Sequence, residues 1–293
     1  MLMKVQITTS VYHIILAHAL STEKYIDYFT KTMKQEEIIG MLIGEWQGLR
    51  NTNPFMTNRA IASVEGVSLL TRSDKRKDRV EIAPEQLHLA ALEAEQISKR
   101  LNRKMCVIGW YHSHPHITVF PSHVDLRTQL SQQYLDSHFF GIIISCFDSS
   151  SDHIQRVQIT CFQAEQASDG TVSRVNVPIE IIPSYTMSSV MRETFLDLPK
   201  RMFEEHNKEY EAATSKRIQY NDQRNVTSDI MTELYNTGVY GQSITHLVDN
   251  VICPATQILE NTSKELDQKV HHIFNTTIMM NNNRMTQFLL SFE

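Results

Sequence analysis

The segment from Gly109 to Asp125 reads GWYHSHPHITVFPSHVD and joins an apolar strand pattern to a dense set of metal-binding side chains. His112 and His114 lie two residues apart at the end of a predicted strand, so alternation places both imidazoles on one face. Asp125 lies eleven residues beyond His114, which is enough chain for a loop to turn back. Two histidines and one carboxylate suit a catalytic zinc ion, which keeps its fourth position for water. The segment therefore predicts one zinc ion per chain, held by His112, His114 and Asp125.

The same segment allows other interpretations. Ser122 and Asp125 have the spacing of a capping pair at the start of a helix, which would explain both residues without a metal. Capping and ligation can also coexist, because a helix start would hold Asp125 in a fixed place. His116 and His123 lie near enough to replace a ligand. However, Pro115 bends the chain before His116, and His123 is expected to point away from Asp125.

A hydrolytic zinc site also needs a base that takes a proton from water and passes it to the leaving amine. Apart from Asp125, residues 109–125 contain no carboxylate. The apolar run EEIIGMLIGEW at residues 36–46 predicts a strand buried on both faces, and Glu36, Glu37 and Glu45 flank it. Spacing alone does not choose among these three glutamates, and a glutamate at the mouth of a buried strand is most often only solvated.

The order of the predicted elements indicates an α/β (α+β) fold in which helices flank a mixed central sheet. Residues 1–185 give the order β–α–β–β–α–β–α–β–β–β, whereas residues 186–293 are almost wholly helical and poor in glycine. We therefore expect two domains, 1–185 and 186–293. In the first, the patterns predict helices at 10–22 and 84–102 and strands at 37–46, 60–70, 105–111, 139–147, 153–162 and 175–182.

The second region predicts a long helical packing seam. Two helices are expected first, at 187–214 and 225–235. From Ile244 to Ile273 apolar residues recur at gaps of three and four with one interruption, which is typical of a helix packed along another helix. Pro254 should kink or restart this helix, since proline lacks the backbone N–H. The seam favours a partner helix from another protein, although an internal helical bundle would also satisfy it.

Charge and cysteine content narrow the class of protein. The 293 residues include 28 basic and 33 acidic side chains, and the net charge of -5 gives no general attraction to nucleic acid or an anionic membrane. The longest early apolar run, residues 11–20, is too short to cross a bilayer. None of the four cysteines forms a Cys-x-x-Cys pair, and Cys106, Cys146 and Cys161 lie in apolar strand patterns. These features predict an intracellular protein of the cytoplasm and nucleus with reduced thiols.

The motif residues resemble those of a known family. His112-Ser-His-Pro, six further residues and Ser122-His-Val-Asp125 match the JAMM (MPN+) motif, His-x-His-Pro-x6-Ser-x-x-Asp. The family's upstream glutamate precedes a hydrophobic-x-Gly step on the first buried strand, and Glu37-Ile-Ile-Gly40 matches that step. The resemblance implies a zinc metalloprotease of the MPN fold over residues 1–185. It also implies that Glu37 is the base and that Ser122 supplies the hydroxyl that steadies the oxyanion.

A narrower resemblance extends along the chain. Residues 73–82 and 109–128 are similar to the lysine-63-linkage-specific deubiquitinase subunits of the BRISC and BRCA1-A assemblies. This implies hydrolysis of isopeptide bonds in lysine-63-linked polyubiquitin. It also implies a catalytically silent MPN partner of the Abraxas type, bound through the coiled-coil dimerisation region at 186–293. The segment from Tyr25 to Gln35 departs from the pattern as an insertion ahead of Glu37.

Two other functions compete with hydrolysis. Many MPN domains lack the metal-binding residues and serve as non-catalytic scaffold subunits of larger complexes, whereas this chain has every ligand type. A zinc deaminase also uses histidine and glutamate, but it needs His-x-Glu followed by Pro-Cys-x-x-Cys, and this chain has neither. The zinc content of the purified protein would separate an enzyme from a scaffold.

Overall fold

The computed structural model describes residues 2–21, 37–49, 59–70, 84–115, 117–149, 154–183, 188–220 and 226–290. Within it the chain forms two compact units, Met1–Val251 and Ile252–Glu293. Several predictions lie outside the described residues: the insertion at 25–35, the segment 73–82 that carries part of the resemblance, and the candidates Glu36 and His116. The predicted domain boundary at residue 185 also falls outside them and stays a prediction.

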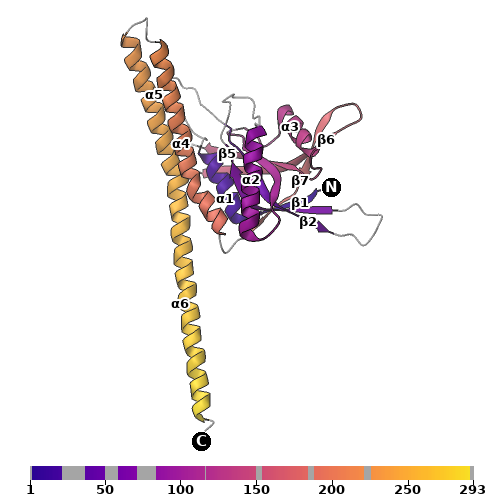
Figure 1. Cartoon of the computed structure of the whole chain (residues 1–293), viewed down its shortest axis with the longest axis vertical. Coiled ribbons are helices and arrows are strands. Elements are labelled where there is room, and N and C mark those ends of the chain that lie inside the picture. Colours follow the sequence, from indigo (N-terminus) through magenta and orange to yellow (C-terminus); the bar gives the residue numbers. More distant parts are fainter. Residues whose placement is uncertain are drawn as a thin grey trace. The chain divides into compact units, whose positions relative to one another are not determined.

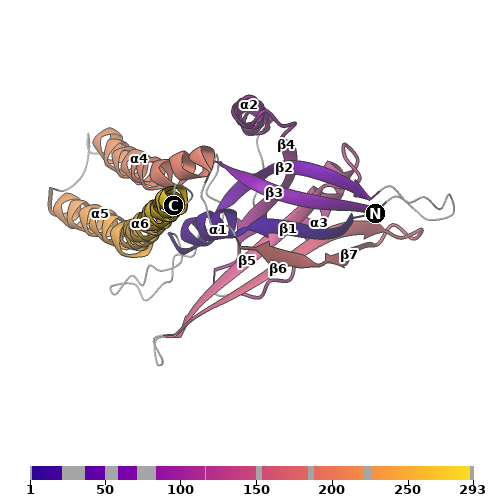
Figure 2. The ribbon, with the colours of Figure 1, turned by 90° about the horizontal axis from the view of Figure 1, so that it is seen from below.

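An eight-stranded mixed sheet forms the core of the first unit (Figures 1 and 2). Its strand order is β7-β6-β5-β4-β2-β3-β1-β8, with parallel pairing of β1 with β3, β1 with β8 and β4 with β5. This arrangement confirms the predicted α+β class with a mixed central sheet. The strands are β1 (Leu2–Thr8), β2 (Ile39–Leu49), β3 (Arg59–Leu69), β4 (Cys106–Ser113), β5 (Phe140–Ser149), β6 (Ile154–Gln166), β7 (Val172–Val177) and β8 (Ile179–Ile182).

The two edges of this sheet meet at one residue. The sequence pattern predicted a single strand at 175–182, and this was wrong, because Pro178 divides the segment into β7 and β8. Proline has no N–H to donate to a ladder. β7 therefore pairs with β6 at one edge, while β8 pairs with β1 at the other, and the Pro178 carbonyl accepts a hydrogen bond from Val5 N at 2.9 Å. The sheet is consequently curled, so that its two edge strands, β7 and β8, lie close together.

Three helices cover the two faces of the sheet. α1 (Thr9–Leu20) packs on the face that carries Tyr111, while α2 (Pro84–Leu101) and α3 (His123–Gln133) pack on the opposite face with Trp110. The Thr8 side chain caps α1 by accepting from Val11 N, and Pro84 begins α2 at the residue that the sequence predicted. Face alternation along β4 places Trp110, His112 and His114 on the side of α2 and α3.

The helical region differs in detail from its prediction. α4 (Ser189–Tyr220) and α5 (Val226–Leu247) are longer than expected, and they pair through the stacked rings of Tyr210 and Tyr240, whose centroids lie 4.8 Å apart. A π-helical turn (Val248–Ile252) follows α5, and α6 (Cys253–Leu290) begins beside Pro254, which confirms the predicted interruption. Each helix is labelled in Figure 1.

The single seam predicted from Ile244 to Ile273 is wrong, because it is divided between the two units. Leu247 and Val251 are buried in the first unit, whereas Val270 and Ile273 on α6 are exposed. The sequence could not show this division, since the spacing of the apolar residues continues across Pro254. The part of the seam at Leu247 and Val251 is therefore covered within the first unit, whereas the part at Val270 and Ile273 on α6 is exposed to solvent.

Candidate metal centre and active site

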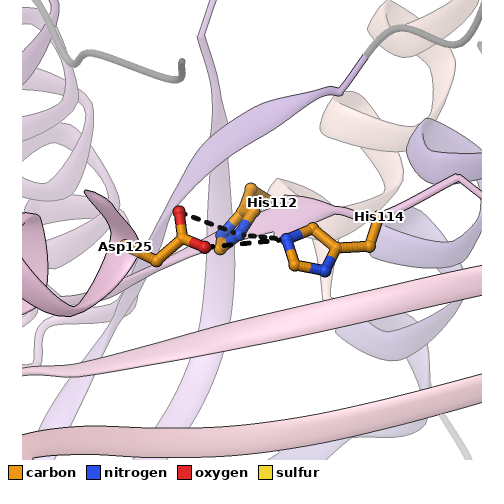
Figure 3. A group of neighbouring side chains, drawn as sticks. All are labelled: His112, His114 and Asp125. Carbon is orange, nitrogen blue, oxygen red and sulfur yellow. Dashed lines mark hydrogen bonds and ion pairs between the residues drawn. The ribbon is translucent and has the colours of Figure 1, made fainter. Parts of the chain in front are cut away.

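The side chains of His112, His114 and Asp125 converge on one point (Figure 3). The Nε2 atoms of the two histidines lie 3.1 Å apart. Asp125 Oδ1 lies 3.5 Å from His112 Nε2, and Asp125 Oδ2 lies 3.7 Å from His114 Nε2. Their exposed fractions are 0%, 4% and 6%, so little water is left to solvate these polar atoms. Among the described residues, they form the only histidine, cysteine or carboxylate cluster that can hold a metal ion.

The separations fit a zinc ion. A tetrahedron with metal–ligand bonds of about 2.0–2.1 Å has edges of about 3.3–3.4 Å. The Nε2–Nε2 separation of 3.1 Å is close to that edge, and so are the distances from the two Nε2 atoms to the carboxylate, 3.5 Å to one oxygen of Asp125 and 3.7 Å to the other. Two neutral imidazoles and a carboxylate, brought this close with their acceptor atoms facing inward, would repel one another without a cation or a proton between them. The donor set therefore suits a metal that accepts three protein ligands and keeps one open position.

The chain fixes His114 and Asp125 by hydrogen bonds outside the cluster. His114 Nδ1 lies 2.7 Å from the Thr118 carbonyl, which can only accept, so Nδ1 carries the proton and the Nε2 lone pair faces the other ligands. Asp125 Oδ2 accepts from Ser122 N at 2.6 Å, and Ser122 Oγ accepts from Asp125 N at 3.2 Å. These two bonds are a capping box at the start of α3. The carboxylate that caps α3 is thus also the one that faces the two histidines and could bind a metal.

The side chains of the cluster shift one another's pKa values. Burial raises the pKa of Asp125, but its contacts with His112 and His114 outweigh this and hold the pKa well below its ordinary value. Burial lowers the pKa of His114, but Asp125, the Thr118 carbonyl and the charge of Glu37 raise it by more. The site therefore favours positive charge at the point where the ligand atoms meet.

Glu37 lies directly before β2 and beside this cluster. The β2–β4 register pairs Ile39 with His112, and its continuation places Glu37 opposite His114. Two hydrogen bonds between Ile38 and Ser113 fasten this end, one from Ile38 N to Ser113 Oγ at 3.0 Å and one from Ser113 N to Ile38 O at 3.1 Å. Burial raises the pKa of Glu37, and the nearby His112 and His114 oppose only part of this shift.

Of the other candidate residues, Glu45 and His123 lie outside the cluster, whereas Ser122 lies at its edge. Glu45 lies on β2, eight residues beyond Glu37 and about 26 Å away by the usual rise of an extended chain, and it pairs with Arg103. Glu45 is therefore not near the cluster. His123 is exposed at the first position of α3 and does not join the three ligands. Ser122 is exposed at the edge of the site, and since its oxygen accepts from Asp125 N, its hydroxyl hydrogen remains able to donate elsewhere.

The groups that support the three clustered side chains were not predicted from the sequence. The Thr118 carbonyl leaves no signal, because any residue supplies a backbone carbonyl. Trp110 and Gln129 also went unnoticed, although both leave a signal. Trp110 lies two residues before His112, on the same face of β4, and Gln129 lies four residues after Asp125, on the same face of α3.

Two sequence profiles match the chain. The profile of the JAB1/Mov34/MPN/PAD-1 ubiquitin protease family matches residues 5–138, and that of the BRCC36 C-terminal helical domain matches residues 191–277. Relatives named Lys-63-specific deubiquitinase BRCC36 include the Mus musculus protein, 36% identical over 285 residues, covering 92% of this chain and 90% of the relative. The Xenopus tropicalis protein of that name is 34% identical over 275 residues, with 92% of each chain covered. The Homo sapiens protein is 33% identical over 310 residues, covering 92% of this chain and 91% of the relative.

Proposed function

Because the chain belongs to the BRCC36 family of JAB1/Mov34/MPN/PAD-1 ubiquitin proteases, we propose that it is a zinc-dependent deubiquitinase that hydrolyses isopeptide bonds in lysine-63-linked polyubiquitin. The resemblance to the JAMM family is confirmed, and the relatives named above are deubiquitinases. One observation carries the proposal: His112, His114 and Asp125 present three ligand atoms within 4.8 Å of one another in a nearly dry site. Such a cluster is needed for hydrolysis and has no use in a scaffold subunit.

The residues around the cluster supply the remaining chemistry. A zinc ion held there would polarise the scissile carbonyl and acidify the attacking water. Glu37 takes the proton from that water as the new C–O bond forms, and then passes it to the ε-amine nitrogen of the leaving lysine, so that the C–N bond breaks and the carbonyl is restored. Ser122 donates its hydroxyl hydrogen to the oxygen of the carbonyl, on which negative charge develops. Asp125 stays ionised through the reaction because its capping bond and both histidines favour the carboxylate.

The decisive experiment is cleavage of linkage-defined diubiquitins by the purified full-length chain, with and without a candidate silent MPN protein. We expect the lysine-63-linked dimer to be cleaved and the lysine-48-linked dimer to remain intact. Cleavage of both linkages at equal rates would contradict the proposed specificity. If no linkage is cleaved in either condition and no zinc co-purifies, the chain is a scaffold subunit.

Metal removal tests the ligand set directly. The double change His112→Ala, His114→Ala removes two of three ligands, so we expect near-complete loss of zinc from the purified protein, measured by elemental analysis. The matched control is His123→Ala, because this histidine is exposed at the start of α3 and lies outside the cluster. Zinc retained in full by the double variant would rule out these ligands.

We also propose a partner helix for α6. Val270, Ile273 and Phe274 expose 65%, 64% and 62% of their surfaces, and with Leu266 and Met280 they form an apolar stripe at helical spacing. Soluble monomers rarely leave such a stripe open to water. The match of residues 191–277 to the BRCC36 C-terminal helical domain supports a helical partner of the Abraxas type, within a BRISC- or BRCA1-A-type assembly.

The compartment follows from the same proposal. We expect the protein in cytoplasm and nucleus, where polyubiquitin chains are formed and removed. None of the helices in the described part of the chain is long and apolar enough to cross a membrane. Imaging of a tagged full-length chain tests this expectation, and a signal confined to membrane-bound organelles would contradict it.

A further inference from the structure

His112 lacks the kind of support that holds the other histidine ligand. A metal-binding histidine usually donates its second ring N–H to a carboxylate, a carbonyl or a water, which fixes the plane of the ring. His114 has such a partner in the Thr118 carbonyl. His112 Nδ1 is buried and has no hydrogen-bond partner among the described residues. Something other than a hydrogen bond must therefore hold the His112 ring.

The indole of Trp110 lies against that ring. The two ring centroids are 4.7 Å apart and the planes differ by only 13°, which is a stacked arrangement. Both side chains are fully buried. Gly141 on β5 makes room for the indole, because a Cβ there would lie 2.9 Å from Trp110 Nε1. A ring packed this closely cannot rotate about its Cβ–Cγ bond without displacing the indole.

The indole is itself fastened to the helix that carries Asp125. Trp110 Nε1 donates to Gln129 Oε1 at 2.8 Å, and Gln129 is fully buried on α3, one turn after Asp125. Gln129 Nε2 donates to the Phe139 carbonyl and to Gln133 Oε1, both at 2.8 Å, so its amide has no unused hydrogen. A fully satisfied buried network of this kind is rigid.

We propose that Trp110 and Gln129 are positioning residues for the metal centre, the indole fixing the His112 ring and its bond to Gln129 setting the separation of His112 from Asp125. This inference rests on the proposed metal site. Neither residue touches the substrate or the metal, so their effect is on how well three ligands from β4 and α3 meet. Loss of groups that orient metal ligands typically weakens metal affinity about 10–100-fold.

The test compares zinc affinity of the full-length chain and its variants by competition with a chromogenic chelator. Gln129→Met keeps the volume of the side chain but cannot accept from the indole, and Trp110→Phe keeps a ring against His112 but loses the N–H. We expect each to weaken zinc binding about 10–100-fold. We also expect the cobalt-substituted variants to show an altered visible spectrum, which reports ligand geometry rather than stability.

Gln163→Met is the matched control. Gln163 is buried on β6 and donates to the Phe139 carbonyl at 3.0 Å and the Ser137 carbonyl at 3.1 Å, but among the described residues it makes no hydrogen bond with Trp110. Gln163→Met and Gln129→Met lose amide hydrogen bonds of similar strength, so we expect both variants to have a lower melting temperature. In Gln163→Met, however, zinc affinity should stay within about twofold of that of the unchanged chain.

The outcomes separate this inference from the proposed function. If Gln129→Met and Trp110→Phe bind zinc as tightly as the unchanged chain, the positioning role is overturned and the metal site stands. If Gln163→Met weakens zinc binding equally, the effect is general destabilisation and the inference fails. If the unchanged chain binds no zinc, the metal site and the inference fall together. Should Gln129→Met not fold, Trp110→Phe alone decides between the first two outcomes.

Discussion

Among single residues, Glu37 carries the sharpest functional prediction. Glu37→Gln keeps the size of the side chain but cannot accept a proton, so turnover should fall by about 10²–10⁴-fold. Zinc content and melting temperature should stay near those of the unchanged chain, because Glu37 is not one of the three ligands. The measurement is kcat on lysine-63-linked diubiquitin, together with elemental analysis. Glu45→Gln is the control and should keep full turnover, because Glu45 lies further along β2 and is paired with Arg103.

Ser122 has two roles that one substitution can separate. Glycine is nearly as good a helix N-cap as serine, so Ser122→Gly should change stability by only a few tenths of a kcal/mol, roughly. The backbone N–H at this position remains and still binds Asp125 Oδ2. With the hydroxyl gone, kcat should fall by about 10²–10³-fold.

Ser122→Ala completes this comparison. It removes the hydroxyl and the cap together, so it should lose as much kcat as the glycine variant and about 0.5–2 kcal/mol of stability besides. Thermal unfolding and kcat measured side by side test this. If loss of kcat followed loss of stability across the two variants, the cap and not the hydroxyl would be the functional feature.

At this scale the sequence predicted which three side chains come together as a cluster that can hold a metal ion, but it did not predict the groups around them. His112, His114 and Asp125 were predicted because period-two alternation and a capping spacing leave few ways to arrange them. The choice of Glu37 needed family resemblance, because its closeness to His114 depends on the pairing of β2 with β4, which lies 75 residues away along the chain. The orienting carbonyl of Thr118 could not be predicted at all.

At the scale of elements, the pairing of β2 with β4 depends on Gly40, which has no side chain. A Cβ on Gly40 would overlap the ring of Tyr111, whose hydroxyl bonds His18 Nδ1 at 2.8 Å. Gly40→Ala should therefore push Tyr111 out of place and cost about 1–3 kcal/mol of stability. It should also reduce turnover, because the same two strands hold Glu37 and His112 together.

A second glycine on the same strand provides the control for this prediction. A Cβ on Gly48 meets nothing within 4 Å, so Gly48→Ala should change stability by no more than about 0.5 kcal/mol. Chemical denaturation of both variants measures the difference. Equal stability of the two variants would show that Tyr111 can move without penalty.

Elements were predicted best where one physical rule acted alone. Apolar runs located the strands at 37–46, 60–70, 105–111 and 139–147, and Pro84 marked the first residue of α2. The prediction failed where two rules met. At 175–182 the apolar pattern continues through Pro178, and only the missing N–H shows that the ladder must end there. At Ile244–Ile273 the helical spacing continues although the structure divides.

For the whole molecule, the division after Val251 defines the informative truncation. Leu247 and Val251 are buried in the first unit, and His246 Nε2 lies 2.7 Å from the Leu20 carbonyl at the end of α1. A chain ending at residue 251 keeps these contacts, whereas one ending near residue 240 would lose them. We expect chain 1–251 to fold and bind zinc, but to lose the partner and the cleavage that depends on it.

The measurements are mass in solution, co-purification with the candidate silent MPN protein, and diubiquitin cleavage. Val270→Asp, Ile273→Asp in the full-length chain should reproduce the truncation, since both side chains are exposed on the α6 stripe. Gln268→Asp adds charge to the same helix at an exposed polar position and serves as the control. A full-length chain that is monomeric and fully active alone would refute the dependence on a partner.

The closure of the sheet at Pro178 also sets an order of events during synthesis. β1 pairs with β3 on one side and β8 on the other, and the register joins Val5 to Ile179, 174 residues later. At about 5–20 residues per second, a ribosome needs roughly 9–35 s to make that stretch. Throughout this interval one side of the first strand has a row of unpaired backbone groups, which invites pairing with other nascent chains. Aggregation should therefore be a greater hazard for the growing chain than for the finished protein, whose last strand covers that edge.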